Sequence, residues 1–184
     1  MAKEIWDAYN ARGNRLGFDL VRGEPIPQGV FHLAVEIVTI ARTGEVLLTR
    51  RHPQKPYGLL WEITGGSALK GEAPLQAAVR ELREETGISM EETALRPLHT
   101  MVVPHSQGIY HTFAAVVPAP CAVTLQEGET VDSRWMPYEE FRVFTKTEEY
   151  AGPLQERGDA LLASLDALWA ALKEEQHGND SPTA

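Results

Sequence analysis

The sequence predicts a layered α/β or α+β domain in which strands pack against flanking helices. Three observations lead to this prediction. Residues 31–41 are apolar and β-branched enough for a buried strand, residues 74–86 carry apolar side chains at helical spacing, and further strand-like runs follow. The length of 184 residues suits one domain with appendages.

The strands are predicted from apolar or β-branched runs that are bounded by turn-forming residues. These runs cover residues 4–9, 16–21, 31–41, 45–51, 61–63, 96–103, 109–117 and 131–136. The first two would pair as a hairpin across the turn at residues 11–14. Gly65 and Gly66 are expected to end the short strand at residues 61–63.

Helices are predicted over residues 74–86, 138–144 and 154–175. Pro74 stands in the first turn, where its missing N–H costs nothing, and Gly87 suits a left-handed C-terminal cap. The last helix carries one stripe of leucines at helical spacing, namely Leu161, Leu165, Leu168 and Leu172. We expect this stripe to pack on the domain core, with an intermolecular helix contact as the alternative.

Four segments organise the chain. They are an N-terminal extension over residues 1–30, a main domain over 31–152, a C-terminal helix over 153–176 packed on it, and a mobile tail over 177–184. Hydrophobic residues make up 43% and charged residues 23%, which excludes a disordered chain. The start, MAKEIWDAYN, lacks the apolar region of a signal peptide, and Cys121 has no partner for a disulfide. We therefore expect a cytoplasmic protein.

The net charge limits the partners. Lys+Arg number 17 against 26 Asp+Glu, a formal net charge of -9, so the overall field repels polyanions. Neither a nucleic-acid polymer nor a membrane is expected as a partner. Phosphate chemistry in such a protein would need a metal ion as a bridge.

The helix predicted at residues 74–86 carries three carboxylates on one face. Glu81, Glu84 and Glu85 fall within an arc of about 100°. They occupy the last two turns, where the helix dipole disfavours negative charge, and an exposed pair between Arg80 and Glu84 offsets only a few tenths of a kcal/mol. A divalent cation would reverse this balance, and Mg²⁺ prefers oxygen ligands. The cluster therefore indicates a metal site rather than a solvated helix face.

Residues 66–88, GSALKGEAPLQAAVRELREETGI, carry the defining positions of a known signature. These positions are Gly66, Glu72, Arg80, Glu81, Leu82, Glu84, Glu85, Gly87 and Ile88. Seven of these positions require one residue type, while Leu82 and Ile88 need only be apolar, and seven such coincidences have a chance on the order of 10⁻⁸ per starting position. The stretch thus resembles the MutT-like Nudix hydrolase family, and the resemblance implies that family's α/β/α sandwich with a mixed sheet over about residues 31–145.

The resemblance also implies an activity. Members hydrolyse a diphosphate bond in a nucleoside diphosphate linked to another group, or in a nucleoside di- or triphosphate, with Mg²⁺ or Mn²⁺ held against the diphosphate. By position, Glu84 and Glu85 match the principal metal ligands, and Gly66 would offer its backbone carbonyl. Glu81 matches a further ligand or the general base that takes a proton from water.

Further catalytic residues follow from the same resemblance. Arg80 matches the residue that orients a motif glutamate. Another carboxylate often joins such a site from a loop beyond the motif, and Glu127 is the best candidate in this chain, with Glu129 second. A solvated loop carboxylate is the alternative for either residue.

Three other functions are alternatives. The segment from His32 through residues 61–66 looks closest to the branch near isopentenyl diphosphate isomerases, but the cysteine that those isomerases use just after the equivalent of Trp61 is missing. An ADP-ribose or nucleotide-sugar pyrophosphatase is a second alternative, since Pro104 stands about where such enzymes carry a proline. A ligand sensor without catalysis is the third, and the intact carboxylate set argues against it.

Substrate contacts are the least specific part of the sequence. Arg50, Arg51 and Lys55 form a basic cluster just ahead of the motif, which would meet a phosphate or a sugar acid, with an ordinary basic loop as the alternative. Tyr57 and Trp61 could stack on a base, although Trp61 beside a glycine pair is more typical of a core anchor. The expected partner is a small phosphorylated molecule of nucleotide type, and a homodimer is left open.

Overall fold

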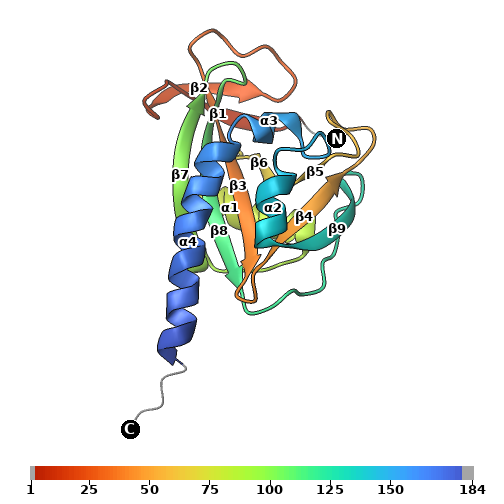
Figure 1. Ribbon diagram of the computed structural model, residues 1–184. Helices are drawn as coiled ribbons and strands as arrows, with labels where there is room; N and C mark the ends of the chain where they lie inside the picture. Colours follow the sequence, from red (N-terminus) through yellow and green to blue (C-terminus); the bar gives the residue numbers. More distant parts are fainter. Residues whose placement is uncertain (1–2, 180–184) are drawn as a thin grey trace.

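The computed structural model describes residues 3–179, and within that range the chain forms a mixed sheet, a separate hairpin and flanking helices (Figure 1). The strands are β1 (Ile5–Tyr9), β2 (Arg15–Val21), β3 (His32–Ala41), β4 (Glu45–Arg51), β5 (Trp61–Glu62), β6 (Thr64–Ser67), β7 (Leu95–Val103), β8 (Gly108–Val117) and β9 (Thr130–Pro137). The helices are α1 (Pro74–Thr86), α2 (Tyr138–Phe144), α3 (Gly152–Gln155) and α4 (Gly158–Asn179), with a short 3₁₀ helix at Glu92–Ala94. No helix in this range is both long and apolar enough to cross a bilayer.

The main sheet has a parallel pair at its centre. Its strands run in the order β5-β4-β3-β8-β7, with β6 paired to β3 and β9 paired to β4. Strands β3 and β8 are parallel from His32 opposite Gly108 to Ala41 opposite Val117, whereas the other ladders of this sheet are antiparallel. All residues of β3 are buried, as expected for a strand that is covered on both faces.

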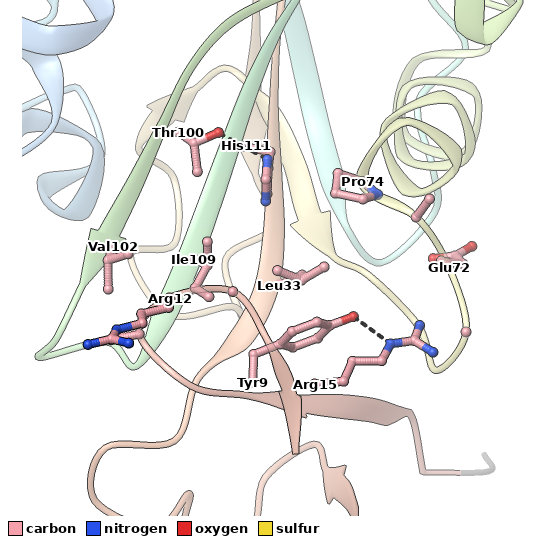
Figure 2. A pocket seen from close by; sticks show the side chains of 14 residues that line it. Tyr9, Arg12, Arg15, Leu33, Glu72, Pro74, Thr100, Val102, Ile109 and His111 are labelled. Carbon is pink, nitrogen blue, oxygen red and sulfur yellow. Dashed lines mark hydrogen bonds between the residues drawn. The ribbon is translucent and has the colours of Figure 1, made fainter. Parts of the chain in front are cut away.

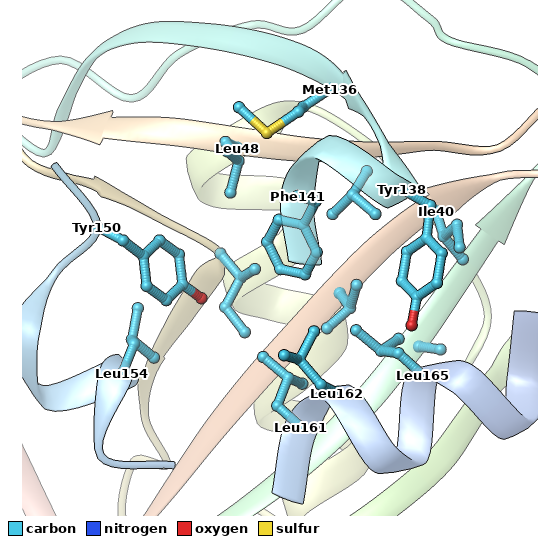
Figure 3. Close-up of a cluster of buried hydrophobic side chains, with 14 of the residues drawn as sticks. Ile40, Leu48, Met136, Tyr138, Phe141, Tyr150, Leu154, Leu161, Leu162 and Leu165 are labelled. Atoms are coloured by element: carbon cyan, nitrogen blue, oxygen red, sulfur yellow. The ribbon is translucent and has the colours of Figure 1, made fainter. Parts of the chain in front are cut away.

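Helices cover the two faces of the sheet. Helix α1 lies behind the sheet, and α2 and α4 lie in front of it (Figure 1). Alternate side chains of β3 enter two cores: Ile37 lies in the cluster with α1, and Ile40 lies in the cluster with α2 and α4. Phe141 and Leu161 belong to the second cluster (Figure 3). The α/β/α sandwich implied by the resemblance is therefore confirmed.

The C-terminal segment differs from the predicted single helix. It forms the short α3 and then α4, because a turn at residues 156–157 interrupts the helix, with the Arg157 N–H donating to the Leu154 carbonyl at 3.2 Å. The predicted leucine stripe of α4 is buried in the core of this chain. Helix α4 continues to Asn179, so the expected tail over residues 177–184 begins as helix, and residues 180–184 lie outside the described part.

The glycine pair does not end a strand, contrary to the sequence prediction. Gly65 and Gly66 lie inside β6, opposite Glu36 and Val35 of β3. A Cβ on Gly65 would lie 2.6 Å from the Val35 carbonyl oxygen, so glycine permits the close approach of the two backbones. The ladder therefore fixes the start of the motif against the centre of the sheet.

The N-terminal hairpin is attached to the loop before α1. Strands β1 and β2 pair as predicted, and Trp6 is buried in a small cluster of its own. The carboxylate of Asp7 accepts a hydrogen bond from the Gly71 N–H at 2.8 Å, and the Ile5 carbonyl accepts one from the Lys70 N–H at 2.8 Å. The hairpin thus holds the chain where it enters the motif helix.

Candidate functional site

Helix α1 positions the three glutamates predicted to bind metal. Pro74 begins the helix, and Gly87 ends it in a left-handed conformation with φ 74°. Glu85 is only 3% exposed, whereas the side chains of Glu81 and Glu84 are 14% and 39% exposed. The cluster therefore ranges from a buried carboxylate to an open one along one helix face.

Arg80 binds the carboxylates that surround it. Its Nε and Nη2 donate to the two oxygens of Glu72 at 2.8 and 2.9 Å, and Nη2 also donates to the Ser67 carbonyl at 3.0 Å. Its Nη1 donates to Glu81 at 2.8 Å and to Glu84 at 3.1 Å. One guanidinium thus fixes two motif glutamates against the loop that precedes the helix.

Gly66 lies directly against Glu81. A Cβ at this position would lie 2.2 Å from Oε1 of Glu81, so any larger residue would displace the carboxylate. Burial raises the pKa of Glu81, while the Arg80 guanidinium acts in the opposite direction. The strand β6 and the helix α1 therefore meet at these two residues.

Glu85 is the most perturbed carboxylate of the cluster. Burial raises its pKa to about 8, and the nearby charges of Glu62 and Glu81 add to that rise. Its Oε2 is buried without a hydrogen-bond partner among the described residues. A carboxyl group in this environment calls for a proton or a cation.

Glu62 joins this cluster, although the sequence analysis did not single it out. It lies in β5, is 7% exposed, and forms an ion pair with Arg51. Burial raises its pKa, against the effect of Arg51. The sequence offered one signal, a glutamate two residues before Thr64 in a motif-adjacent strand, but its burial depends on distant segments.

The predicted basic residues are engaged within the protein. Arg51 donates to the Pro56 carbonyl at 2.7 Å as well as to Glu62, and Lys55 forms an ion pair with Glu129. Glu129 is in turn close enough to Glu62 to influence its pKa. The second-choice loop carboxylate therefore lies near the cluster.

Arg50 and Glu127 form no hydrogen bond or ion pair with the motif glutamates among the described residues. Arg50 donates to the Leu59 carbonyl at 2.9 Å and sits 5.7 Å from the Trp61 ring centroid. The Arg134 guanidinium lies 4.2 Å from the same ring, so Trp61 is a core anchor. Glu127 is exposed and has no hydrogen bond or ion pair with any residue in the described part of the chain.

A cavity of about 260 Å³ adjoins the glycine pair. Its walls come from β3, the loop before β5, the segment from Glu62 to Ser67, β8 and the junction of α3 with α4. Arg51 and Glu62 lie on its wall, and so do Gly65 and Gly66. Because Gly66 also lies against Glu81, this cavity, which we call the β3 cavity, adjoins the carboxylate cluster.

The donor types of the cluster fit a hard divalent cation. Glu81, Glu84 and Glu85 supply carboxylate oxygens, and Gly66 supplies a backbone carbonyl. Within residues 3–179, no three acidic, histidine or cysteine side chains already converge as a complete metal site, so the carboxylates would have to turn toward an ion. The buried Oε2 of Glu85 is the unsatisfied atom that such an ion would satisfy.

A second cavity, of about 490 Å³, lies between the hairpin and the sheet (Figure 2). Tyr9, Leu33 and Ile109 line it, and two polar pairs lie there: Thr100 with His111 at 3.0 Å, and Arg15 with the Tyr9 hydroxyl at 3.1 Å. Leu33 and His32 are neighbours on β3, so the two cavities lie on opposite faces of that strand. The larger cavity does not include the carboxylates of the α1 C-terminal turns.

Comparison with known proteins agrees with this geometry. The NUDIX domain family matches residues 30–156. An uncharacterised Nudix hydrolase of Listeria monocytogenes, lmo0368, is 30% identical over 149 residues, which are 80% of this chain and 88% of that protein. The crystal structure of DR0079 from Deinococcus radiodurans superposes with a TM-score of 0.71 at 21% identity, covering 85% of this chain and 98% of that one. The NUDIX domain of Shewanella oneidensis NrtR, solved with ADP ribose, superposes with a TM-score of 0.57 at 20% identity over 74% and 87% of the two chains.

Proposed function

The chain belongs to the Nudix hydrolase family, and on that premise we propose that it cleaves a diphosphate bond in a nucleoside diphosphate derivative by attack of water, with the help of Mg²⁺ or Mn²⁺. The observation that carries the proposal is the buried Glu85 carboxyl, which has an unpartnered oxygen and a pKa of about 8 beside two other glutamates. A fold that retains such a group without a cation loses stability.

The roles follow the placement of the side chains. Glu84, Glu85 and the Gly66 carbonyl would hold the cation, which when bound polarises phosphoryl oxygens and makes water more acidic. Glu81 would accept the proton of the attacking water, because it stands between Gly66 and Arg80. Arg80 would keep Glu81 in that position through the hydrogen bond that its Nη1 donates to the Glu81 carboxylate.

The basic residues ahead of the motif have two roles in this proposal. Arg51 and Lys55 would contact the phosphates of the substrate, because both lie close to Glu62, which in turn lies close to Glu85. Arg50 would act by holding the Leu59 backbone in the adjoining loop. Glu127, which the family resemblance offers, is kept as the alternative proton acceptor.

The test is a panel assay with product analysis by mass. Nucleoside di- and triphosphates, nucleotide sugars including ADP-ribose, dinucleotides and isopentenyl diphosphate are incubated with Mg²⁺. Hydrolysis of at least one nucleoside diphosphate derivative, abolished by chelation, is expected. Deuterium uptake into isopentenyl diphosphate in heavy water would favour the isomerase instead.

The variant Glu85→Gln tests whether the activity depends on the carboxylates of α1. Glu85→Gln keeps size and removes the charge, so most of the turnover should disappear while the fold remains intact, and Mg²⁺ should no longer raise the melting temperature as it does in the wild type. Glu92→Gln, in the exposed 3₁₀ helix, is the matched control and should behave as the wild type. Full activity of Glu85→Gln at saturating Mg²⁺ would refute the assignment.

A further inference from the structure

The β3 cavity contains a buried arginine that neither the motif nor the family resemblance assigns. Arg157 stands at the turn between α3 and α4, lines the cavity, and is 5% exposed. Its Nε donates to Glu36 Oε1 at 3.0 Å and its Nη2 to the same oxygen at 2.5 Å. Thr112 donates to the other oxygen of Glu36 at 3.0 Å. The position of the guanidinium is thus fixed from β3 and β8.

One nitrogen of the Arg157 guanidinium, Nη1, does not bind Glu36. Nη1 of Arg157 has no hydrogen-bond partner among the described residues, and a buried donor without a partner costs stability. The Cζ atom of Arg157 lies 3.9 Å from the Tyr110 ring centroid, which leaves the guanidinium little freedom to turn elsewhere. The arrangement presents a rigid donor at the cavity wall.

The charges around the cavity are already balanced. The described cations of its lining are Arg51 and Arg157, and each is paired with one carboxylate, Glu62 and Glu36 respectively. His32, also on the wall, is stacked on Trp6 at 4.5 Å between ring centroids, and burial lowers its pKa to about 4, so it is neutral near pH 7. A further phosphate would find no uncompensated positive charge here, whereas an uncharged group would meet no repulsion.

The size and shape of the β3 cavity further restrict which ligand can fit. The volume of about 260 Å³ is smaller than the roughly 300–1,000 Å³ typical of sites for drug-sized ligands, so one ring system fits better than a whole nucleotide. Tyr57 lines the cavity with a 54% exposed side chain and is held in the left-handed region at φ 58°. An aromatic ring presented in this way is suited to cover a planar ligand.

We propose that the β3 cavity receives the uncharged ring attached to the substrate's diphosphate, and that Nη1 of Arg157 selects it by donating a hydrogen bond to a carbonyl, hydroxyl or ring-nitrogen acceptor on that ring. This inference deepens the proposed function, on which it rests for the position of the diphosphate. It assigns a specificity-determining role to a residue outside the motif, and it excludes a second phosphate as the occupant.

The first experiment measures binding without turnover. Saturation-transfer NMR in the presence of a chelator is applied to adenosine, guanosine, uridine, cytidine and ribose, with inorganic phosphate as a competitor. We expect at least one ring compound to bind, phosphate not to displace it, and Arg157→Lys to weaken that binding about tenfold, because lysine keeps the ion pair with Glu36 but lacks the planar fork. Binding of none of these compounds, or displacement by phosphate, would overturn the proposal.

The second experiment uses the best substrate of the hydrolase panel. Arg157→Lys should raise KM about tenfold with little change in kcat, and it should reduce the preference among substrates that differ only in the ring. Ala34→Val narrows the same cavity without touching the ion pair and should have the same effect, which covers the case in which Arg157→Lys fails to fold. Arg42→Lys, paired with Glu175 at 2.9 Å away from the cavity lining, is the control.

The two proposals can fail separately. If no diphosphate in the panel is hydrolysed, the proposed function is wrong, and the NMR titration still decides whether the cavity binds a ring. If hydrolysis is observed but Arg157→Lys and Ala34→Val leave ring preference and ring binding unchanged, the assignment of Arg157 is wrong and the hydrolase stands.

Discussion

Arg80 and Arg157 are both mostly buried, and both bind glutamates, yet their surroundings differ. Arg80 uses all three of its nitrogens on Glu72, Glu81, Glu84 and a backbone carbonyl. Arg157 uses two nitrogens on one carboxylate, and its third has no partner in the part of the chain that the structure describes. A fully bonded arginine positions other groups, whereas an arginine that is fixed but not saturated has a donor to offer to a ligand.

The two arginines also differ in what their carboxylates do. The glutamates around Arg80 outnumber it, so the site on α1 has a negative excess that suits a cation. Arg157 and Glu36 balance one another, so the β3 cavity suits an uncharged group. The two proposals accordingly assign the diphosphate to the α1 carboxylates and the ring to the β3 cavity.

The largest expected effect tests the Arg80 side. Glu81→Gln keeps the size and the hydrogen bond to Arg80 but removes the proton acceptor, so kcat should fall by about 10²–10⁴-fold with little change in substrate affinity. Steady-state kinetics of Glu81→Gln and Glu127→Gln across pH and Mg²⁺ concentration measure this. Loss in Glu127→Gln with only weakened metal binding in Glu81→Gln would transfer the role to Glu127.

The pH dependence of the free energy of unfolding tests the β3 cavity, which both Arg157 and His32 line. The pKa of His32 is lowered from 6.5 to about 4 by burial, so the unfolded chain binds more protons than the folded one between these values. Stability should therefore fall as pH drops from 6.5 to 4, by up to about 3 kcal/mol from this residue. Urea unfolding of the wild type and His32→Gln at pH 7.5 and 4.5 isolates the contribution. A stability difference between the two proteins that does not change with pH would contradict a neutral, buried His32.

A smaller effect is expected from Arg80→Lys. An ammonium group has three donors on one atom and cannot replace the five hydrogen bonds of the guanidinium, so the motif glutamates should lose their orientation and activity should fall by about 10–100-fold. Arg83→Lys is the control, because Arg83 is exposed on the same helix and has no ion pair among residues 3–179. If Arg80→Lys retained full activity at a normal melting temperature, the fully bonded arginine would not be the positioning group.

Local patterns explain which parts of this molecule the sequence could predict. Helix α1 has the predicted bounds because Pro74, the apolar spacing and Gly87 all act within residues 74–87. The strand pair β3 and β4 and the three carboxylates of α1 follow from equally local signals. Such signals suffice where the energy comes from neighbours in the sequence.

The remaining parts depend on contacts between distant segments. Strand β6 exists because Gly65 and Gly66 approach β3, and no local rule distinguishes that approach from a turn. The burial of Glu62 depends on β4. The sequence pattern places Arg157 inside a continuous helix, whereas in the structure Arg157 lies at a turn and pairs with Glu36. Conformation at these positions is decided by tertiary packing rather than by propensity.

The pairing of Glu36 with Arg157 also sets an order for biosynthesis. The two residues are 121 positions apart. At the usual 5–20 residues per second, a ribosome therefore adds Arg157 roughly 6 to 24 seconds after it adds Glu36. Strand β3 likewise waits for β8 before its parallel edge is covered. Until translation passes residue 157, the centre of the sheet carries an uncompensated charge, so chains that stop earlier should be retained by chaperones or degraded rather than accumulate as a folded enzyme core.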